Sequence, residues 1–366
     1  MHLAGTENIE ENMINEVLGD YNVFIINRYP PQTSIYRTAE DIFSVLKGAI
    51  WINLLFNADG WNLPHQGIDY RSKFIGNSTL THALRNFSFA DALRVINSGK
   101  WKGKKLIHYS NQFSGTFNLN GTADIVSVHD SPHYLERNSI ISKLFMRHIY
   151  SSIKEKEFIL TNTDNLAKEL RDYGFTGHIT PIHLPYSPVF HKLTEPKDEI
   201  RNRLKLPLDK KLILSVSSNS PRKNLPVIRK IMNLLGGGYK LVRVGSSLED
   251  SLNFEGVNDN RLNEIYNACD VLLFPSLYEG FGLPIVEAFA SGLPVVTSDL
   301  PTIREVAGNA AVLVDPMDTD SILKGIKVAI ENESLSEVGL ARAKEFTRVN
   351  FKEKLIRFYE MVKKSC

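Results

Sequence analysis

Residues 275–297 read PSLYEGFGLPIVEAFASGLPVVT, and this stretch decides the fold of the chain. An apolar run over 271–274 precedes it and ends at a proline, which is typical of a buried parallel strand. Gly280 and Gly282 let main-chain N–H groups approach a ligand, because neither carries a Cβ. Pro284 fits the first helical position, where a missing N–H is no loss. The sequence therefore predicts a strand, a glycine-rich turn and a helix.

Two carboxylates flank this turn: Glu279 precedes the helix start, and Glu287 lies on the helix. A helix start at the carboxyl end of a parallel strand offers free N–H donors and the positive end of the helix dipole, so it suits an anion. Because carboxylates would repel that anion, we expect both acids to accept hydrogen bonds from sugar and ribose hydroxyls beside it. A helix-capping Glu279 and a solvent-exposed Glu287 are the simpler alternative.

With seven residues between the two acids, the segment EGFGLPIVEAFASGLPVV resembles the signature of family 4 retaining glycosyltransferases with the GT-B fold. The resemblance implies an α/β protein of two Rossmann-like domains, whose parallel sheets face a central cleft. It implies a nucleoside diphosphate sugar as co-substrate, no cofactor and no obligatory metal. Glu287 would bind the ribose. The transferred sugar would be held by Glu279 and by the backbone of Phe281, Gly282 and Leu283. The nucleotide base would lie near Val257.

Length and composition indicate an ordinary globular protein. With 366 residues, 43% of them hydrophobic, the chain can form two domains. Lysine and arginine total 43 against 41 acidic residues, so we expect no nucleic-acid partner. The cysteines, Cys269 and Cys366, are too few for a disulfide framework and indicate a reducing, cytoplasmic compartment. Residues 1–12 are acidic and do not resemble a secretory signal.

Apolar runs alternate with helical patterns along the chain, which predicts parallel sheets with helices on both faces. The expected strands lie near 22–26, 50–56, 105–109, 123–128, 157–160, 178–183, 212–215, 240–244, 271–274, 294–297 and 311–314. The proline-rich segment 181–196 marks the passage from a first domain, 1–188, to a second, 189–350. The resemblance implies that the first domain faces the acceptor, that the second binds the nucleotide sugar, and that a C-terminal helix, 351–366, packs back on the first.

A second candidate motif, SSNSPRKN over 217–224, follows an apolar strand. Its small polar residues and its cations can surround a diphosphate with N–H groups, hydroxyls and positive charge. When the sugar leaves, negative charge grows on the diphosphate, and a cation placed there stabilises this state more than the intact donor. We therefore assign Lys223 to catalysis. The nucleotide is assigned to Ser217, Ser218 and Arg222.

The cations of this motif depart from the family pattern. Relatives commonly carry an arginine at the position of Ser218 and a lysine at that of Lys223. Because Ser218 is a serine, either Arg222 takes the place of the missing cation or the site works with one cation and more hydroxyl donors. A basic surface turn in which Asn224 caps the next helix is the alternative without a ligand.

Residues 125–132, IVSVHDSP, place His129 and Asp130 at the end of an apolar strand. Open α/β sheets bind ligands at the carboxyl ends of their strands. The turn resembles the His-Asp turn with which the family contacts the donor sugar, so we assign His129 to positioning rather than to general-base chemistry; a structural histidine is the alternative. Residues 161–163 resemble the turn that opens the next helix of the family, and helix capping explains them equally well.

No metal site is expected. Asp318 and Asp320 are spaced like a metal–nucleotide motif, but they follow Pro316 and precede a helical stretch, 321–331. Capping and the helix dipole explain both acids. The cysteines and histidines of the chain show no zinc spacing.

Residues 137–156 mix aliphatic and aromatic side chains with lysine and arginine. Such a helix can lie peripherally on a membrane that contains anionic phospholipid. An ordinary helix that covers a sheet and exposes a charged face is the alternative. Exposed apolar side chains on this helix would favour the membrane.

These observations predict a metal-independent hexosyltransferase that moves a sugar from a nucleoside diphosphate sugar to an acceptor hydroxyl, with retention of configuration. The cation missing at Ser218 and a glycine-free first loop, 27–34, leave open a non-catalytic nucleotide-sugar binding or scaffold protein of the same fold. A dinucleotide-dependent oxidoreductase would need GxGxxG after an early strand, which the sequence lacks. The sugar, the base, the acceptor and the oligomeric state stay open.

Overall fold

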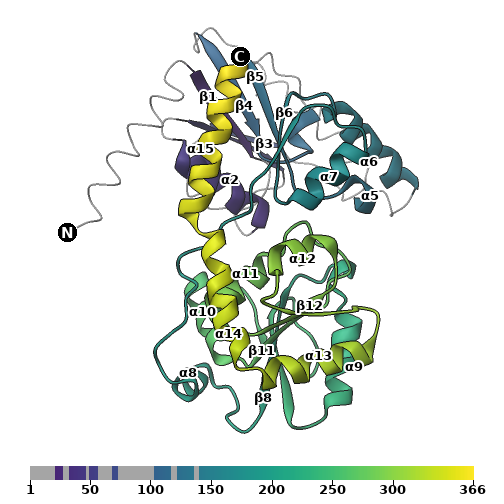
Figure 1. Cartoon of the computed structure of the whole chain (residues 1–366), viewed down its shortest axis with the longest axis vertical. Coiled ribbons are helices and arrows are strands. Elements are labelled where there is room, and N and C mark those ends of the chain that lie inside the picture. Colours follow the sequence, from purple (N-terminus) through teal and green to yellow (C-terminus); the bar gives the residue numbers. More distant parts are fainter. Residues whose placement is uncertain are drawn as a thin grey trace, which may run out of the picture. The chain divides into compact units, whose positions relative to one another are not determined.

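The computed structural model describes residues 21–27, 33–46, 49–56, 68–72, 103–116, 122–135 and 140–366 (Figure 1). The chain divides into two compact units. The first consists of Met1–His183 and Phe351–Cys366, and the second of Leu184–Asn350. The boundary lies inside the proline-containing segment 181–196.

The first unit contains a parallel sheet of seven strands in the order β3-β2-β1-β4-β5-β6-β7. The strands are β1 (Tyr21–Asn27), β2 (Ile50–Phe56), β3 (Ile68–Ser72), β4 (Lys104–Tyr109), β5 (Ala123–Val128), β6 (Phe158–Thr161) and β7 (His178–Pro181). In the register of the inner strand β1, Phe24 pairs with Ile50 of β2 and with Ile107 of β4. Six strands lie where the sequence predicts them, and β3 is additional. The first loop, which follows β1, lies outside the described residues at 28–32.

Helices cover both faces of this sheet. They are α2 (Ser34–Val45), the 3₁₀ turn η2 (Ser114–Thr116), α5 (Pro132–Leu135), α6 (Ile140–Ile153), α7 (Asp164–Asp172) and α15 (Arg348–Ser365). Val23 and Ile25 of β1 share a core with α2 and α15, whereas Phe24 and Ile26 share a core with α6 and α7. Because successive side chains of a strand point to opposite faces, a strand buried on both faces is apolar throughout.

The C-terminal helix α15 belongs to the core of the first unit. Its residues Phe351 and Leu355 are buried against the sheet. The hydroxyl of Tyr359 lies 2.5 Å from Nδ1 of His108 on β4, and Nε2 of the same ring lies 2.8 Å from the hydroxyl of Ser127 on β5. Burial lowers the pKa of His108 to about 3, so the ring is neutral. The helix thus completes the core of the first unit, although the whole second unit lies between them in the sequence.

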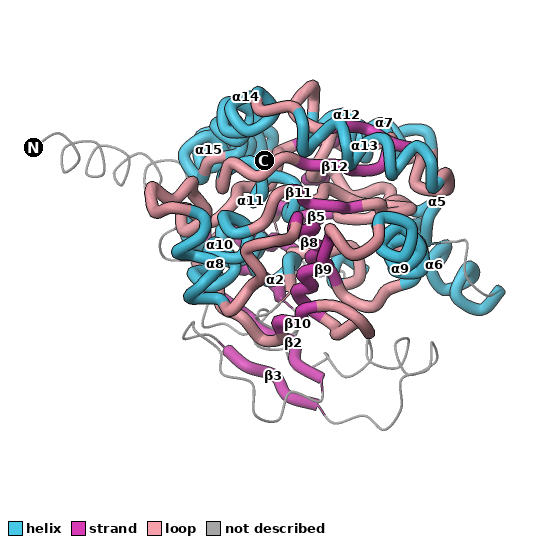
Figure 2. Tube along the Cα trace, turned by 90° about the horizontal axis from the view of Figure 1, so that it is seen from below, coloured by secondary structure: helices cyan, strands magenta, loops and turns pink. Residues whose placement is uncertain are grey.

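The second unit contains a parallel sheet of six strands in the order β10-β9-β8-β11-β12-β13. Figure 2 shows β12, β11, β8, β9 and β10 following one another in this order. The strands are β8 (Lys211–Ser217), β9 (Tyr239–Gly245), β10 (Leu252–Phe254), β11 (Val271–Phe274), β12 (Val295–Ser298) and β13 (Val312–Val314). The five predicted strands are present, and the three-residue β10 is additional.

Helices also cover both faces of the second sheet. They are α8 (Lys197–Leu204), the 3₁₀ turn η3 (Pro221–Lys223), α9 (Leu225–Leu235), α10 (Asp259–Ala268), α11 (Leu283–Ala290), α12 (Pro301–Ala307), α13 (Thr319–Glu331), α14 (Ser334–Ala343) and the 3₁₀ turn η4 (Lys344–Phe346). Leu272 of β11 shares a core with α10 and α11, and its neighbour Leu273 shares a core with α9 and α13. The predicted architecture of two α/β domains with parallel sheets is therefore confirmed.

Candidate active site

Two loops meet at the carboxyl ends of β8 and β11, which are neighbours in the second sheet. From β8 the chain continues to β9 and β10 on one side, and it later passes through β11 to β12 and β13 on the other. Open α/β sheets bind ligands at such a switch point, outside the carboxyl ends of the strands. Residues 218–224 follow β8 and residues 275–282 follow β11. These are the two motifs that the sequence singles out.

Hydrogen bonds join these loops. The N–H of Leu277 donates to the carbonyl oxygen of Arg222 over 2.7 Å. The side-chain amide of Asn224 donates to the carbonyl oxygens of Pro275 at 3.2 Å and of Pro316 at 2.9 Å. Asn224 stands at the start of α9, but its side chain makes no capping bond there. It fixes one loop against the other instead.

Lys223 and Glu279 form a buried ion pair at this switch point. Nζ of Lys223 lies 2.5 Å from Oε1 of Glu279, and the side chains are only 11% and 6% exposed. The same Nζ lies 4.8 Å from the centre of the Phe274 ring, at the end of β11. The structure thus brings together the cation and the carboxylate that the sequence assigns to leaving-group stabilisation and to the sugar.

The turn before α11 requires a glycine. Gly282 has a φ of 101°, which residues with a Cβ rarely adopt. An added Cβ would also lie 3.1 Å from Cδ1 of Ile285 and 3.3 Å from Cδ1 of Ile303. Helix α11 starts at Leu283, so Pro284 occupies the second helical position and not the predicted first. Pro284 has no N–H, and the N–H of Ile285 donates to the carbonyl oxygen of Gly282 over 2.9 Å, so a ligand at this turn can bind the N–H of Leu283.

The side chain of Phe281 packs in the core, whereas its backbone lies just before the start of α11. The ring is buried and packs edge-on against Phe346, with the two ring centres 5.8 Å apart. This packing fixes the main chain at the start of α11. Only backbone groups of Phe281, Gly282 and Leu283 were assigned to the sugar, and the buried ring is compatible with that assignment.

Glu287 is buried on α11, so the alternative of a solvent-exposed acid is wrong. Its Oε2 accepts a hydrogen bond of 2.9 Å from the hydroxyl of Tyr266 on α10. Tyr266 is not among the site residues predicted from the sequence. A tyrosine on the buried face of a predicted helix was the available signal, because its hydroxyl needs a polar partner there.

The remaining predicted nucleotide residues lie around the same loop or farther along the chain. Ser217 ends β8, Ser218 is exposed beyond it, and Arg222 is half-buried in η3. Val257 lies between β10 and α10, where its side chain packs against the core. The sequence analysis also missed Arg243 on β9, whose guanidinium donates to the carbonyl oxygens of the β8 loop. Its signal was a single arginine within the apolar strand 240–244.

His129 lies in the first unit, directly after β5, and is buried. Its Nε2 donates to the carbonyl oxygen of Ser110 over 2.7 Å, and its Nδ1 lies 3.1 Å from Oδ1 of Asn162. Burial lowers the pKa of His129. Both ring nitrogens are therefore engaged inside the unit, and the contact with a donor sugar stays a prediction. The neighbouring Thr163 caps α7 by accepting from the N–H of Leu166.

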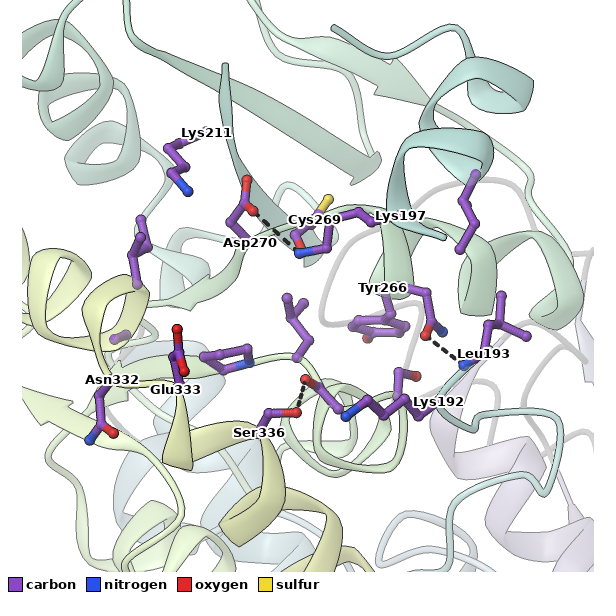
Figure 3. Close-up of a pocket in the computed structure, with 18 of the residues that line it drawn as sticks. Lys192, Leu193, Lys197, Lys211, Tyr266, Cys269, Asp270, Asn332, Glu333 and Ser336 are labelled. Carbon is purple, nitrogen blue, oxygen red and sulfur yellow. Dashed lines mark hydrogen bonds and ion pairs between the residues drawn. The ribbon is translucent and has the colours of Figure 1, made fainter. Parts of the chain in front are cut away.

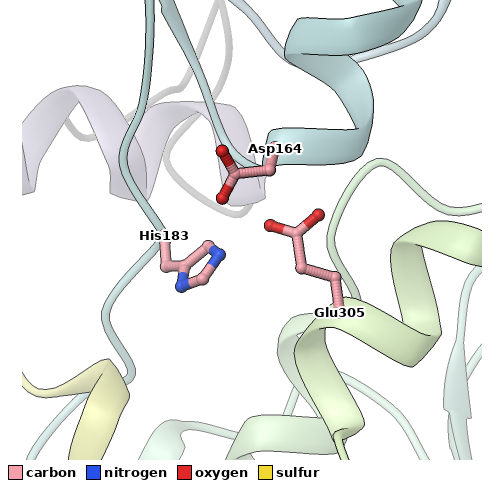
Figure 4. A group of neighbouring side chains, drawn as sticks. All are labelled: Asp164, His183 and Glu305. Carbon is pink, nitrogen blue, oxygen red and sulfur yellow. The ribbon is translucent and has the colours of Figure 1, made fainter.

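Of the two acids with the spacing of a metal motif, Asp318 has a structural role. Oδ1 of Asp318 caps α13 by accepting from the N–H of Asp320 over 2.9 Å. In the first unit, ligand atoms of Asp164 and His183 lie within 4.8 Å of each other (Figure 4). These are two protein ligands, fewer than the three of a typical catalytic zinc site. Glu305, drawn with them, stands on α12 of the other unit.

Helix α6 has a buried face and an exposed apolar end. Ile149 and Ile153 are buried against the sheet, as expected for a covering helix. Ile140 and Leu144, however, are 79% and 62% exposed. None of the helices in the described ranges has the length and the apolar content that a membrane span requires.

A pocket of about 390 Å³ lies at the opposite edge of the second sheet, near the amino ends of β8, β11 and β12 (Figure 3). Its charged side chains largely pair with one another or with adjacent residues. Lys197 pairs with Asp270 over 3.3 Å, and Asp270 also pairs with Arg201 over 2.7 Å. The predicted site residues do not line this pocket.

Known proteins resemble the chain in sequence. Residues 196–346 match the family Glycosyl transferases group 1. The O-antigen chain mannosyltransferase RfbU of Salmonella typhimurium is 28% identical over 279 residues, which are 69% of this chain and 73% of that protein. The O-antigen chain mannosyltransferase B of Escherichia coli is 39% identical over 110 residues, which are 29% of each protein.

Solved structures resemble the chain in fold. The sucrose-phosphate synthase from Thermosynechococcus elongatus has a TM-score of 0.78 at 16% identity and covers 94% of this chain and 100% of its own. WaaG, a glycosyltransferase involved in lipopolysaccharide biosynthesis, has a TM-score of 0.71 at 15% identity and covers 91% of this chain and 98% of its own. Residues 196–346 thus form a Glycosyl transferases group 1 domain, and the likenesses to these solved structures, together with the two parallel-sheet domains, show the GT-B fold.

Proposed function

We propose that the protein transfers mannose from a nucleoside diphosphate mannose to a hydroxyl of a growing surface glycan, with retention of configuration. The observation that carries the proposal is the Lys223–Glu279 pair at the switch point of the second sheet. The names of two relatives, both O-antigen chain mannosyltransferases, support mannose and the glycan acceptor. The structural relative HepE from Anabaena, solved with UDP and glucose, supports a nucleotide-sugar donor.

The proposed transfer takes place on one face of the sugar. The bond between the anomeric carbon and the diphosphate oxygen breaks while the acceptor oxygen bonds to that carbon from the same side. The acceptor proton passes to the departing phosphate oxygen, so no protein base is required. Lys223 and the N–H groups at the start of α11 offset the charge that grows on the diphosphate.

Glu279 would accept hydrogen bonds from hydroxyls of the transferred sugar. In the structure its Oε1 is occupied by the ammonium of Lys223, which a diphosphate would attract away. Glu287, held by the hydroxyl of Tyr266, would accept from the ribose hydroxyls. His129 would position the sugar and not act as a base. In this scheme the chemistry needs no metal.

A panel of nucleoside diphosphate sugars tests this function. A donor present at about 100 times its dissociation constant should stabilise the protein by about 2.7 kcal/mol in thermal unfolding. Release of the nucleoside diphosphate in the presence of an acceptor glycan would then separate an enzyme from the non-catalytic alternative. Stabilisation by a donor without any turnover would favour a binding or scaffold protein.

We also infer that α6 attaches the protein to an anionic membrane surface. The exposed Ile140 and Leu144 lie four residues apart, hence on one face of the helix. Lys143 and the exposed Arg147 fall on the same face at the neighbouring spacings. Apolar side chains beside basic ones are the combination that binds a bilayer with anionic headgroups. A glycosyltransferase that elongates a membrane-anchored glycan would gain access to its acceptor in this way.

A further inference from the structure

Arg243 of β9 is a buried cation without an acidic partner among the described residues. Its Nη1 donates to the carbonyl oxygens of Ser215 at 3.0 Å and of Val244 at 2.7 Å. Its Nη2 donates to the carbonyl oxygen of Ser217 and, at 3.5 Å, to that of Ser218. Its Nε has no hydrogen-bond partner among the residues that the structure describes. Burial lowers the pKa of this guanidinium to about 10, so it is still charged at neutral pH.

A second buried arginine of the same unit, Arg201, has the acidic partner that Arg243 lacks. Arg201 donates to the carbonyl oxygen of Ala268 and forms an ion pair of 2.7 Å with Asp270. Removing a charge from water is strongly unfavourable unless an opposite charge compensates it. Arg201 has such a charge at the amino edge of the sheet. Arg243, at the carboxyl edge, has only neutral carbonyl groups, so its environment is suited to an anion from outside the chain.

The contacts of Arg243 also set the direction of the loop after β8. In a trans peptide the carbonyl oxygen and the following N–H point in opposite directions. Because the carbonyl oxygens of Ser217 and Ser218 face Arg243, the N–H groups of Ser218 and Asn219 face away from it. Neither N–H has an acceptor among the residues that the structure describes. Successive free N–H groups of this kind form an anion-binding concavity.

We propose that Arg243 is the positioning residue that replaces the cation missing at Ser218, and that it aims the loop's N–H groups at the diphosphate of the donor. The proposal rests on the proposed function and adds to it a residue that does not touch the substrate. It selects Arg243 over Arg222 because the guanidinium of Arg243 bonds to the carbonyl groups of Ser217 and Ser218 themselves. The charge lies behind the loop, where it supplements that of Lys223.

Binding measurements with and without phosphate groups test the proposal. The ligands are inorganic pyrophosphate, the pair UDP and uridine, and the pair GDP and guanosine. Arg243→Met should weaken the binding of pyrophosphate and of the recognised nucleoside diphosphate about tenfold or more, a change of about 1.4 kcal/mol or more. The affinity for the matching nucleoside should stay within about twofold, because it lacks the diphosphate on which the loop acts. A purely structural arginine would alter both affinities by the same factor.

Two further variants make the result specific. Adding Ser218→Arg to Arg243→Met restores a cation at the family's usual position and should recover the diphosphate affinity. Arg201→Met, which removes the matched buried arginine, should lower thermal stability and leave the ratio of diphosphate to nucleoside affinity unchanged. If Arg243→Met does not fold, Arg243→Lys keeps the charge, loses the planar fork and should show a smaller selective loss.

Equal losses for nucleoside and diphosphate, or no recovery by Ser218→Arg, would overturn the role of Arg243. The proposed function is judged separately, on the parental protein. If the parental protein binds no nucleoside diphosphate and releases none from a sugar donor, the function and this inference both fail. If it does both while Arg243→Met keeps the parental affinity ratio, only the inference fails.

Discussion

Buried charged side chains have different partners at the two edges of the second sheet. At the amino edge, Asp270 accepts from the N–H of Leu212 and pairs with Arg201 and Lys197, so the protein neutralises its own charges. At the carboxyl edge, Arg243 has carbonyl groups alone and Lys223 shares its charge with Glu279. The comparison teaches that each buried arginine has a different kind of environment: Arg201 at the amino edge has an acidic partner, whereas Arg243 at the carboxyl edge has none among the described residues.

The largest effects are expected for the carboxyl edge. Lys223→Met and Glu279→Gln should each lower kcat about 100-fold or more, because each removes a group aimed at the departing diphosphate or at the sugar. Each should also reduce the free energy of unfolding by about 3 kcal/mol, since one buried charge loses its partner. Steady-state kinetics and urea unfolding measure the two quantities.

The double variant Lys223→Met, Glu279→Gln separates these effects. It should recover most of the stability and none of the activity, because no charge is left unpaired. Parental turnover in any of the three variants would remove the pair from the mechanism, and the difference between the two edges would lose its functional meaning.

At the amino edge the expected effect is on stability alone, because Asp270→Asn leaves the buried Arg201 without its acidic partner. Burial would raise the pKa of Asp270, but the hydrogen bond from Leu212 and the charges of Lys197 and Arg201 bring it below its usual value. The stability from this group is therefore full above the unfolded pKa, about 3.9, and is lost as the pH falls through the lower folded pKa. In this acidic range, Asp270→Asn should reduce the slope of the free energy of unfolding against pH by at most about 1.4 kcal/mol per pH unit.

The same Asp270→Asn protein serves as the control for the carboxyl edge. Its kcat and its KM for the donor at neutral pH should equal the parental values. A loss of turnover at unchanged stability would show that the amino edge also takes part in catalysis, which contradicts the comparison.

Tyr266 connects the two edges: it lines the pocket at the amino edge (Figure 3). Its hydroxyl donates a hydrogen bond to Glu287. Tyr266→Phe removes that hydrogen bond alone. We expect KM for the donor to rise about threefold to tenfold, as for the loss of one hydrogen bond of ordinary net strength, with kcat unchanged. An unchanged KM together with lower stability would assign Glu287 to the core and not to the ribose.

The smallest effect concerns a surface outside both edges. Ile140→Ser with Leu144→Ser should reduce the affinity for vesicles that contain phosphatidylglycerol, measured by co-sedimentation, by about 30-fold, since each exposed side chain contributes about 1 kcal/mol on partial burial. Leu234→Ser, at an exposed leucine of α9, is the matched control and should bind as the parental protein does. Equal binding by all three proteins, or equal binding to neutral vesicles, would exclude α6 as the attachment surface.

Much of the fold was predictable, because buried parallel strands are apolar on both faces and stand out in the sequence. Strand β3 was missed because its segment, IDYRS, is largely polar, and β10 because it has only three residues. The proximity of Lys223 and Glu279 followed from placing both motifs at carboxyl ends of strands. Arg243 and Tyr266 each left a signal in the sequence, but their partners were not predictable, since the contacts join distant segments and those of Arg243 run to backbone carbonyl groups, which any sequence provides.

Helix α15 has a consequence for biosynthesis. The first sheet is made early, yet part of its core, including the Tyr359 hydroxyl against His108, comes from a helix translated after the whole second unit. During translation the second unit can complete its own core while the first still exposes the apolar face that α15 will cover. The second unit can therefore reach its native state first, whereas the first unit depends on a helix that is translated after it.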